Sequence, residues 1–162
     1  MIESGNGAQA PAAVATTYAG RWVSATLGAQ GLRTDVRART HDFSADEPVA
    51  LGGTDAGPTP FELLLAALGS CMTMTMRLYA DRKGWPLDGA RVQLRTAPSR
   101  DPDPEVRMVG AKRVTHIEQR IEVTGALSEA QRARLIEIAD RCPVKRALEG
   151  GIQVVTASGE AT

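Results

Sequence analysis

"TPFELLLAALGSCMTMTMRLYADRKG", residues 59–84, is the most apolar part of the chain and predicts one long helix. Thr59 as N-cap, Pro60 at the first helical position and Glu62 at the third predict where the helix begins, because this combination forms a capping box. No charged residue occurs from 63 to 76. A helix that is apolar on every side has to be enclosed on every side, and we expect a second copy of the chain to complete the enclosure.

The segments around this helix predict an α+β fold. Gly84 follows two basic residues and is expected to end the long helix. Ser128, with Gln131 three residues later, predicts the start of an amphipathic helix over 127–141, and a short helix is expected from Pro143 to Gly150. Segments with strand patterns are 16–27, 32–40, 90–97, 112–125 and 152–157, whereas 41–60 and 98–106 read as loops. Consecutive hairpins imply antiparallel sheets.

Length and charge exclude several classes of function. The 162 residues suit one domain, which we place at 16–162 after a flexible tail at 1–15. Basic and acidic residues number 19 each, so nothing favours nucleic acid or an anionic membrane as a partner. No uncharged run approaches the ~18 residues of a membrane span, and the N-terminus lacks the features of a signal peptide. We therefore expect a cytoplasmic protein.

The chain has two cysteines, Cys71 in the long helix and Cys142 at the end of the amphipathic stripe. Each could be a small core residue, or the two could form a redox pair. Cys142 precedes Pro143 at a helix start, where backbone N–H groups favour a thiolate, whereas Cys71 would need a cation from elsewhere in the fold. A metal site is not expected, because there is no C-x-x-C and the two histidines, His41 and His116, are isolated. No cofactor is expected.

Two segments carry a resemblance to a known family. "GPTPFELLLAALGSCMTMTMRLYADRKGWPL" and "DRCPVKRALEGGIQV", each centred on a cysteine, closely resemble the two signature segments of the OsmC/Ohr family of thiol-dependent hydroperoxide reductases. The loop "RTHDFSADEPVALGGTDAGPTP" resembles the segment before the long helix in one branch of OsmC-like proteins. The likeness extends from about residue 37 to residue 156. Two separate matching segments make it specific.

The resemblance implies an intertwined homodimer in which antiparallel sheets wrap two long central helices. It also implies a peroxidase that reduces organic hydroperoxides in oxidative stress defence, with an external dithiol as reductant. Carried over by position, Cys71 attacks the peroxide and Cys142 resolves the sulfenic acid as a disulfide. An apolar pocket beside Cys71 would favour apolar hydroperoxides. Residues of the long helix are candidates for its lining: Leu64, Leu68, Met72, Met74 and Met76.

The chain departs from the family pattern at the residues that support the thiolate. The peroxidase branch has a glutamate directly after the helix proline, but here Phe61 follows Pro60 and Glu62 comes one position later. One residue is ~100° of helix rotation, so Glu62 has a different direction and a capping role is the competing interpretation. A thiolate-stabilising arginine is expected from the first hairpin or just after it. Arg39 is our choice for it, and Arg33 and Arg37 are the other candidates. Arg146, one helical turn after Cys142, could also help to hold a thiolate. A solvated surface position is the alternative for each of these arginines.

Two other functions remain open from the sequence. The shifted Glu62 is compatible with a dimeric module that keeps the pocket for a small lipophilic ligand and has little or no catalysis. A redox sensor that signals by disulfide formation is a third interpretation, although no docking tail for a partner is visible. The physiological peroxide and reductant are not encoded in any motif that we recognise.

Overall fold

A computed structural model describes residues 22–98 and 114–156 of the chain. The chain divides into two compact units with the boundary at Pro60, and each unit is described by itself. The predicted tail at 1–15 and nearly all of the predicted loop at 98–106 lie outside the described residues. A single domain over 16–162 stays a prediction.

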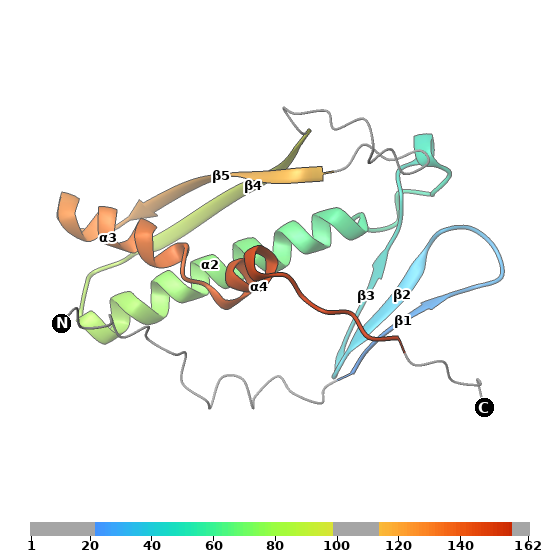
Figure 1. Ribbon diagram of the computed structural model, residues 1–162, viewed down its shortest axis with the longest axis horizontal. Helices are drawn as coiled ribbons and strands as arrows, with labels where there is room; N and C mark the ends of the chain where they lie inside the picture. Colours follow the sequence, from blue (N-terminus) through green and yellow to red (C-terminus); the bar gives the residue numbers. More distant parts are fainter. Residues whose placement is uncertain (1–21, 99–113, 157–162) are drawn as a thin grey trace, which may run out of the picture. The chain divides into compact units, whose positions relative to one another are not determined.

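The first unit is a three-stranded antiparallel meander in the order β1-β2-β3 (Figure 1). It comprises β1 (Val23–Leu27), β2 (Thr34–Ala38) and β3 (His41–Ala45). The hairpin of β1 and β2 was expected from the sequence. The loop prediction for 41–60 is wrong at its start, because β3 pairs with β2 from Ala38 opposite His41 onward. Arg39, with φ of 60°, makes the tight turn between them in the left-handed region, and no glycine or asparagine signals it in the sequence.

The rest of that loop is organised around one buried carboxylate. Asp46 is 2% exposed and follows β3. It accepts hydrogen bonds from the Thr54 hydroxyl at 2.6 Å and from the backbone N–H groups of Glu47, Thr54 and Ala56. A short 3₁₀ helix, η1 (Val49–Leu51), lies inside the loop. Gly53 is required there, because a Cβ atom on it would lie 1.8 Å from the Glu47 carbonyl oxygen.

The second unit begins with the long helix, α2 (Pro60–Lys83). Its predicted end is confirmed, because Gly84 has φ of 64° and its N–H bonds the Asp81 carbonyl. The next N–H, of Trp85, bonds the Ala80 carbonyl at 2.9 Å. These two bonds form a Schellman motif, in which a left-handed glycine stops the helix and satisfies its last carbonyls.

One side of α2 packs against an antiparallel hairpin, β4 (Gly89–Pro98) and β5 (Val114–Thr124) (Figure 1). The predicted inward residues Val92 and Leu94 on β4, and Ile117, Ile121 and Val123 on β5, all pack against the core. Fully buried Met72, Met76 and Leu135 lie at its centre. The α+β class with antiparallel sheets and one long helix is thus present in the chain.

Two helices follow the hairpin: α3 (Glu129–Ala139) and α4 (Pro143–Gly150). The predicted capping box is confirmed, since Ser128 Oγ accepts from the Gln131 N–H and the Gln131 side chain accepts from the Ser128 N–H. The predicted stripe of Leu135, Ile138, Ala139 and Cys142 is buried.

The strand predicted at 152–157 is absent from its described part, because 151–156 forms neither helix nor strand. Ile152, Val154 and Val155 there are 65%, 87% and 87% exposed. An extended segment becomes a strand only when a neighbouring strand pairs with it.

The opposite side of α2 is exposed within this chain. Met74 and Leu78 are 63% and 65% exposed, and Ala66, Ala67 and Ser70 are exposed on the preceding turns. By length and composition alone α2 would pass as a membrane span, but so does the core helix of many soluble proteins.

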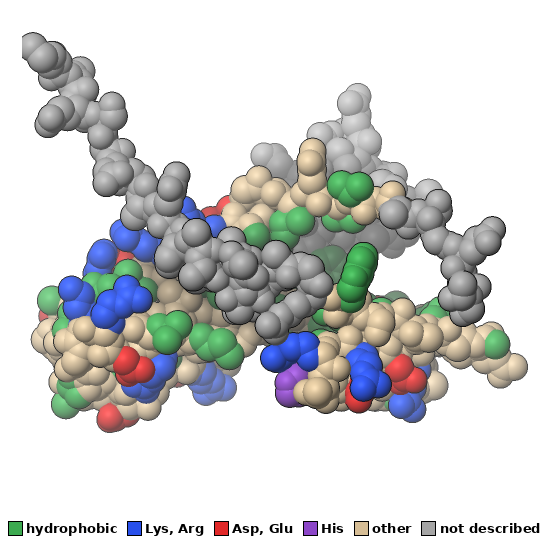
Figure 2. Space-filling view, turned by 90° about the horizontal axis from the view of Figure 1, so that it is seen from below, with side chains coloured by type: hydrophobic (Ala, Val, Ile, Leu, Met, Phe, Trp, Pro, Cys, Tyr) green, Lys and Arg blue, Asp and Glu red, His purple; other side chains and the backbone are tan. Residues whose placement is uncertain are grey.

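Acidic, basic and hydrophobic side chains are interspersed on the face that Figure 2 shows.

Candidate functional site

The two cysteines belong to the same core in the second unit. Cys142 is 0% exposed and is the N-cap of α4, where its Sγ atom accepts a hydrogen bond from the Lys145 N–H at 3.3 Å. Cys71, half-buried on α2, packs against the core cluster that contains Cys142. Both thiols are free, and the Cys71 side chain is near enough to Cys142 to raise the pKa of its thiol. The fold therefore brings together two thiols from distant parts of the sequence.

Burial controls the protonation of Cys142. It raises the pKa of the thiol from 9.0 to about 11, and the neighbouring Cys71 side chain adds to the rise. The Lys145 N–H acts in the opposite direction, because it stabilises a thiolate, but it is the smaller effect. The expected N–H contact at the helix start is thus present, whereas the expected preference for a thiolate is wrong.

An ion pair spans the corner between α3 and α4, where Cys142 lies. Lys145 Nζ is 2.5 Å from Asp140 Oδ1 and 3.8 Å from Glu149 Oε1. Gln119 Nε2, from β5, donates to the same Asp140 oxygen at 2.9 Å. The hydrogen bonds from Lys145 and then from Gln119 hold the pKa of the Asp140 carboxyl below its usual range. Asp140 is consequently a carboxylate at neutral pH.

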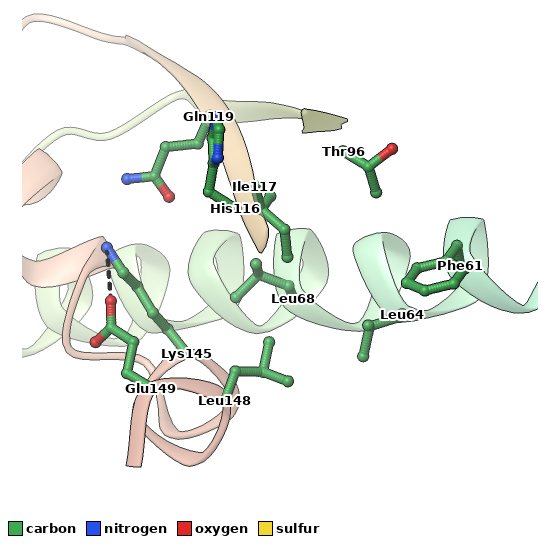
Figure 3. Close-up of a pocket in the computed structure, with 10 residues that line it drawn as sticks. All are labelled: Phe61, Leu64, Leu68, Thr96, His116, Ile117, Gln119, Lys145, Leu148 and Glu149. Atoms are coloured by element: carbon green, nitrogen blue, oxygen red, sulfur yellow. Dashed lines mark ion pairs between the residues drawn. The ribbon is translucent and has the colours of Figure 1, made fainter. Parts of the chain in front are cut away.

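A cavity of about 570 Å³ opens between α2, the β4–β5 hairpin and α4 (Figure 3). Phe61 and Leu64 lie at one end of it, and the polar side chains of Gln119, Lys145 and Glu149 lie at the other (Figure 3). Its remaining lining residues are Leu68, Thr96, His116, Ile117 and Leu148. A volume of this size suits a small organic molecule with an apolar body.

Neither cysteine lines the cavity, but a helical neighbour of each one does. Leu68 is one turn before Cys71 on α2, and Lys145, whose N–H touches Cys142 Sγ, lies one turn after it on α4. Leu64 and Leu68, which the sequence suggested, line the cavity. The suggested methionines do not, since Met72 and Met76 are buried in the core and Met74 is exposed.

The predicted supporting residues are divided between the two units. Arg39 belongs to the first unit, where its carbonyl accepts from Arg37 Nε at 3.4 Å, and Glu62 is an exposed residue in the first turn of α2. Arg33 is paired with Asp35 at 3.4 Å, and Arg37 with Asp42 at 3.7 Å. Catalytic roles for Cys71, Cys142, Arg39 and Glu62 stay predictions.

The sequence interpretation missed Lys145, Asp140 and Gln119. Lys145 is three residues after Cys142, the spacing at which an N-cap side chain meets a backbone N–H, so a signal for it was present. Gln119 is distant in sequence, and no local pattern connects it to Asp140. Among the described residues no group of three metal-ligating side chains is found.

Fold and site together define an α+β protein in which a half-buried and a buried thiol share one core, near a cavity with an apolar end and a polar end. The OsmC-like protein family model matches residues 53–157, and the chain belongs to this family. No curated protein matches the chain significantly.

Solved structures of similar fold include an OsmC-like protein from Mycoplasma pneumoniae, at 20% identity and a TM-score of 0.65, covering 82% of this chain and 89% of that one. Another is an organic hydroperoxide resistance protein from Elizabethkingia anophelis with bound thiocyanate, at 19% identity and a TM-score of 0.56, covering 81% and 89%. A third is an organic hydroperoxide resistance protein from Vibrio cholerae with captopril in an active site, at 17% identity and a TM-score of 0.52, covering 80% and 85%. At these sequence identities, the structural likeness is evidence for the fold alone.

Proposed function

We propose that the protein is a thiol-dependent peroxidase that reduces organic hydroperoxides through Cys71 and Cys142. The observation that carries the proposal is that these two free thiols share one core, and that neighbours of each on its helix line a partly apolar cavity. Cys71 is the more accessible of the two, so it is the one that meets the peroxide. Family members described as organic hydroperoxide resistance proteins share the fold.

The reaction balances with these two sulfur atoms. The Cys71 thiolate attacks the terminal oxygen of the hydroperoxide, the O–O bond breaks, and the alkoxide takes a proton to leave as an alcohol. Cys71 is then a sulfenic acid, which Cys142 attacks to form the disulfide with loss of water. An external dithiol reduces the disulfide in the cytoplasm. No cofactor takes part.

A homodimer is part of the proposal. The exposed side of α2, with Met74 and Leu78, and the exposed apolar residues of 151–156 are surfaces that a second copy would cover. Strands of the second copy would pair with residues 151–156, which pair with no strand among the described residues of a single copy. Arg39 is the residue we propose as the cation beside the Cys71 thiolate, and Glu62 stays a candidate for a supporting carboxylate.

Thiol titration before and after one equivalent of cumene hydroperoxide tests the proposal. We expect the loss of two thiols per chain, recovery of both with dithiothreitol, and turnover with a dithiol reductant. Cys71→Ser should abolish peroxide consumption, whereas Cys142→Ser should allow one turnover and leave a sulfenic acid that dimedone traps. Folded protein that loses no thiol and turns over no peroxide would refute the proposal.

The second candidate function is binding of a small lipophilic molecule without efficient catalysis. The displaced Glu62 and the high pKa of Cys142 favour it over a redox sensor. In this case Cys71→Ser would keep the affinity for an apolar fluorescent probe, and Leu68→Trp, which fills the cavity, would lose it. Rapid two-thiol oxidation in the titration above would speak against this alternative.

A further inference from the structure

The corner that carries Cys142 is held on both sides by charged residues. Asp140 is the C-cap of α3, and Lys145 lies in the first turn of α4. Their ion pair, with Nζ and Oδ1 2.5 Å apart, therefore spans the three-residue connection between the helices, residues 140–142. The Lys145 side chain is 20% exposed and the Asp140 side chain 46%, so water screens this pair less than a pair of two fully exposed side chains.

The same carboxylate connects the corner to the sheet. Gln119 on β5 donates to Asp140 Oδ1 at 2.9 Å, so one oxygen atom joins β5, α3 and α4. Glu149 is a weaker partner for Lys145, at 3.8 Å, and it lies on α4 itself. Among the partners of Lys145 that the structure describes, only Asp140 also contacts β5. Asp140 is therefore the partner that fixes the position of α4 relative to β5.

Lys145 transmits this constraint to the sulfur atom. Its side chain binds Asp140, while its backbone N–H donates to Cys142 Sγ at 3.3 Å. A displacement of Lys145 would move both contacts at once. Disulfide formation tolerates little displacement, because the two Cα atoms have to lie about 4.4–6.8 Å apart with a narrow range of dihedral angles.

We propose that the ion pair between Asp140 and Lys145 positions Cys142 for disulfide formation with Cys71. Both are positioning residues, since they act through Cys142. In the reaction they serve, Cys142 Sγ attacks Cys71 Sγ of the sulfenic acid, the S–O bond breaks, and the hydroxide leaves as water with the thiol proton. This role rests on the proposed peroxidase function, but the effect on the disulfide can be measured without any peroxide.

The first measurement is equilibration of the protein with mixtures of oxidised and reduced dithiothreitol. Here the Cys71–Cys142 disulfide forms by exchange, oxidised dithiothreitol is reduced, and mass spectrometry gives the disulfide fraction. For Asp140→Asn and Lys145→Gln we expect the equilibrium constant for the disulfide to fall by roughly tenfold. Lys145→Arg keeps the ion pair and should restore it.

Glu137→Gln is the matched control. It removes a comparable pair, Arg134 with Glu137 at 2.6 Å, from the same part of the fold without touching Cys142. The control should leave the disulfide constant at the wild-type value. Because either partner can be replaced to break the ion pair, the test remains decisive if one variant folds poorly.

The second measurement separates positioning from a general structural effect. After one equivalent of cumene hydroperoxide, Asp140→Asn, at a position outside the cavity lining, should consume peroxide in the first turnover as fast as wild type. This variant should accumulate a dimedone-trapped sulfenic acid on Cys71, because the second step is slower. A purely structural role would lower the melting temperature without shifting the balance between sulfenic acid and disulfide.

The outcomes distinguish the two proposals. Wild-type disulfide constants in both charge variants would overturn the positioning role. If the wild-type disulfide forms in dithiothreitol mixtures but not with peroxide, the peroxidase proposal is refuted. If its equilibrium constant in dithiothreitol also falls in both charge variants, the positioning role is still supported. Absence of a Cys71–Cys142 disulfide under both conditions would overturn both.

Discussion

The thiol of Cys142 is expected to stay protonated at neutral pH. Burial first, and the neighbouring Cys71 second, raise its pKa from 9.0 to about 11. Because each pKa unit changes the ratio of thiolate to thiol tenfold, about one Cys142 in 10,000 is a thiolate at pH 7, against about one in 100 for a pKa of 9. Disulfide formation should therefore accelerate about tenfold per pH unit between pH 7 and 9.

The perturbation that tests this reasoning is Cys71→Ala. It removes the neighbouring thiol and leaves most of the burial, so the pKa of Cys142 should fall but remain above 9.0. Protein labelled with ¹³Cβ-cysteine gives one NMR signal in this variant, and its chemical shift against pH reports the pKa directly. Wild-type protein gives the reference curve.

The same shift has a consequence for stability, with a defined sign. A pKa that is higher in the folded state than in the unfolded state adds stability below the unfolded value, and this contribution disappears as the pH rises from about 9 to about 11. Urea unfolding across this pH range should show this loss of stability in the wild type, and a smaller loss in the Cys71→Ala variant. A wild-type pKa of Cys142 at or below 9 would refute the argument that burial outweighs the Lys145 N–H.

Three further predictions concern the scaffold. Leu135→Ala, at a fully buried position, should lower the free energy of unfolding by about 2–5 kcal/mol in urea titrations, whereas Ile136→Ala beside it, 40% exposed, should change it by less than about 1 kcal/mol; equal losses would contradict the assigned core. Gly53→Ala should destabilise the loop after β3 by at least about 1–3 kcal/mol, because its Cβ atom would overlap the Glu47 carbonyl, whereas Gly28→Ala, with open space around it, should be close to neutral; thermal melts of both variants check this. The Thr54 hydroxyl, followed by backbone N–H groups, lowers the pKa of Asp46 from 3.8 to about 2, so its contribution is complete above pH 3.8 and disappears as the pH falls toward 2; Asp46→Asn should remove this component from acid unfolding curves, and unchanged curves would count against it.

Local patterns in the sequence determined where the helices begin and end. Gly84 stops α2 in a left-handed conformation, and Ser128 with Gln131 caps α3, because these devices involve residues at most five positions apart. The buried stripe that ends at Cys142 follows from helical periodicity alone. The two signature segments were also sufficient for the family, since each is continuous in sequence.

Tertiary structure decided the rest, because the contacts involved join distant residues. β3 depends on pairing with β2, and the expected strand at 152–157 has no such partner among the described residues. The meeting of Cys71 with Cys142, and of Gln119 with Asp140 and Lys145, follows from packing α2, β5 and the α3–α4 corner together. Whether Cys142 favours a thiolate could not be inferred from its place at a helix start, since the free energy of burying the charge exceeds that of one N–H contact and is fixed only when the core closes.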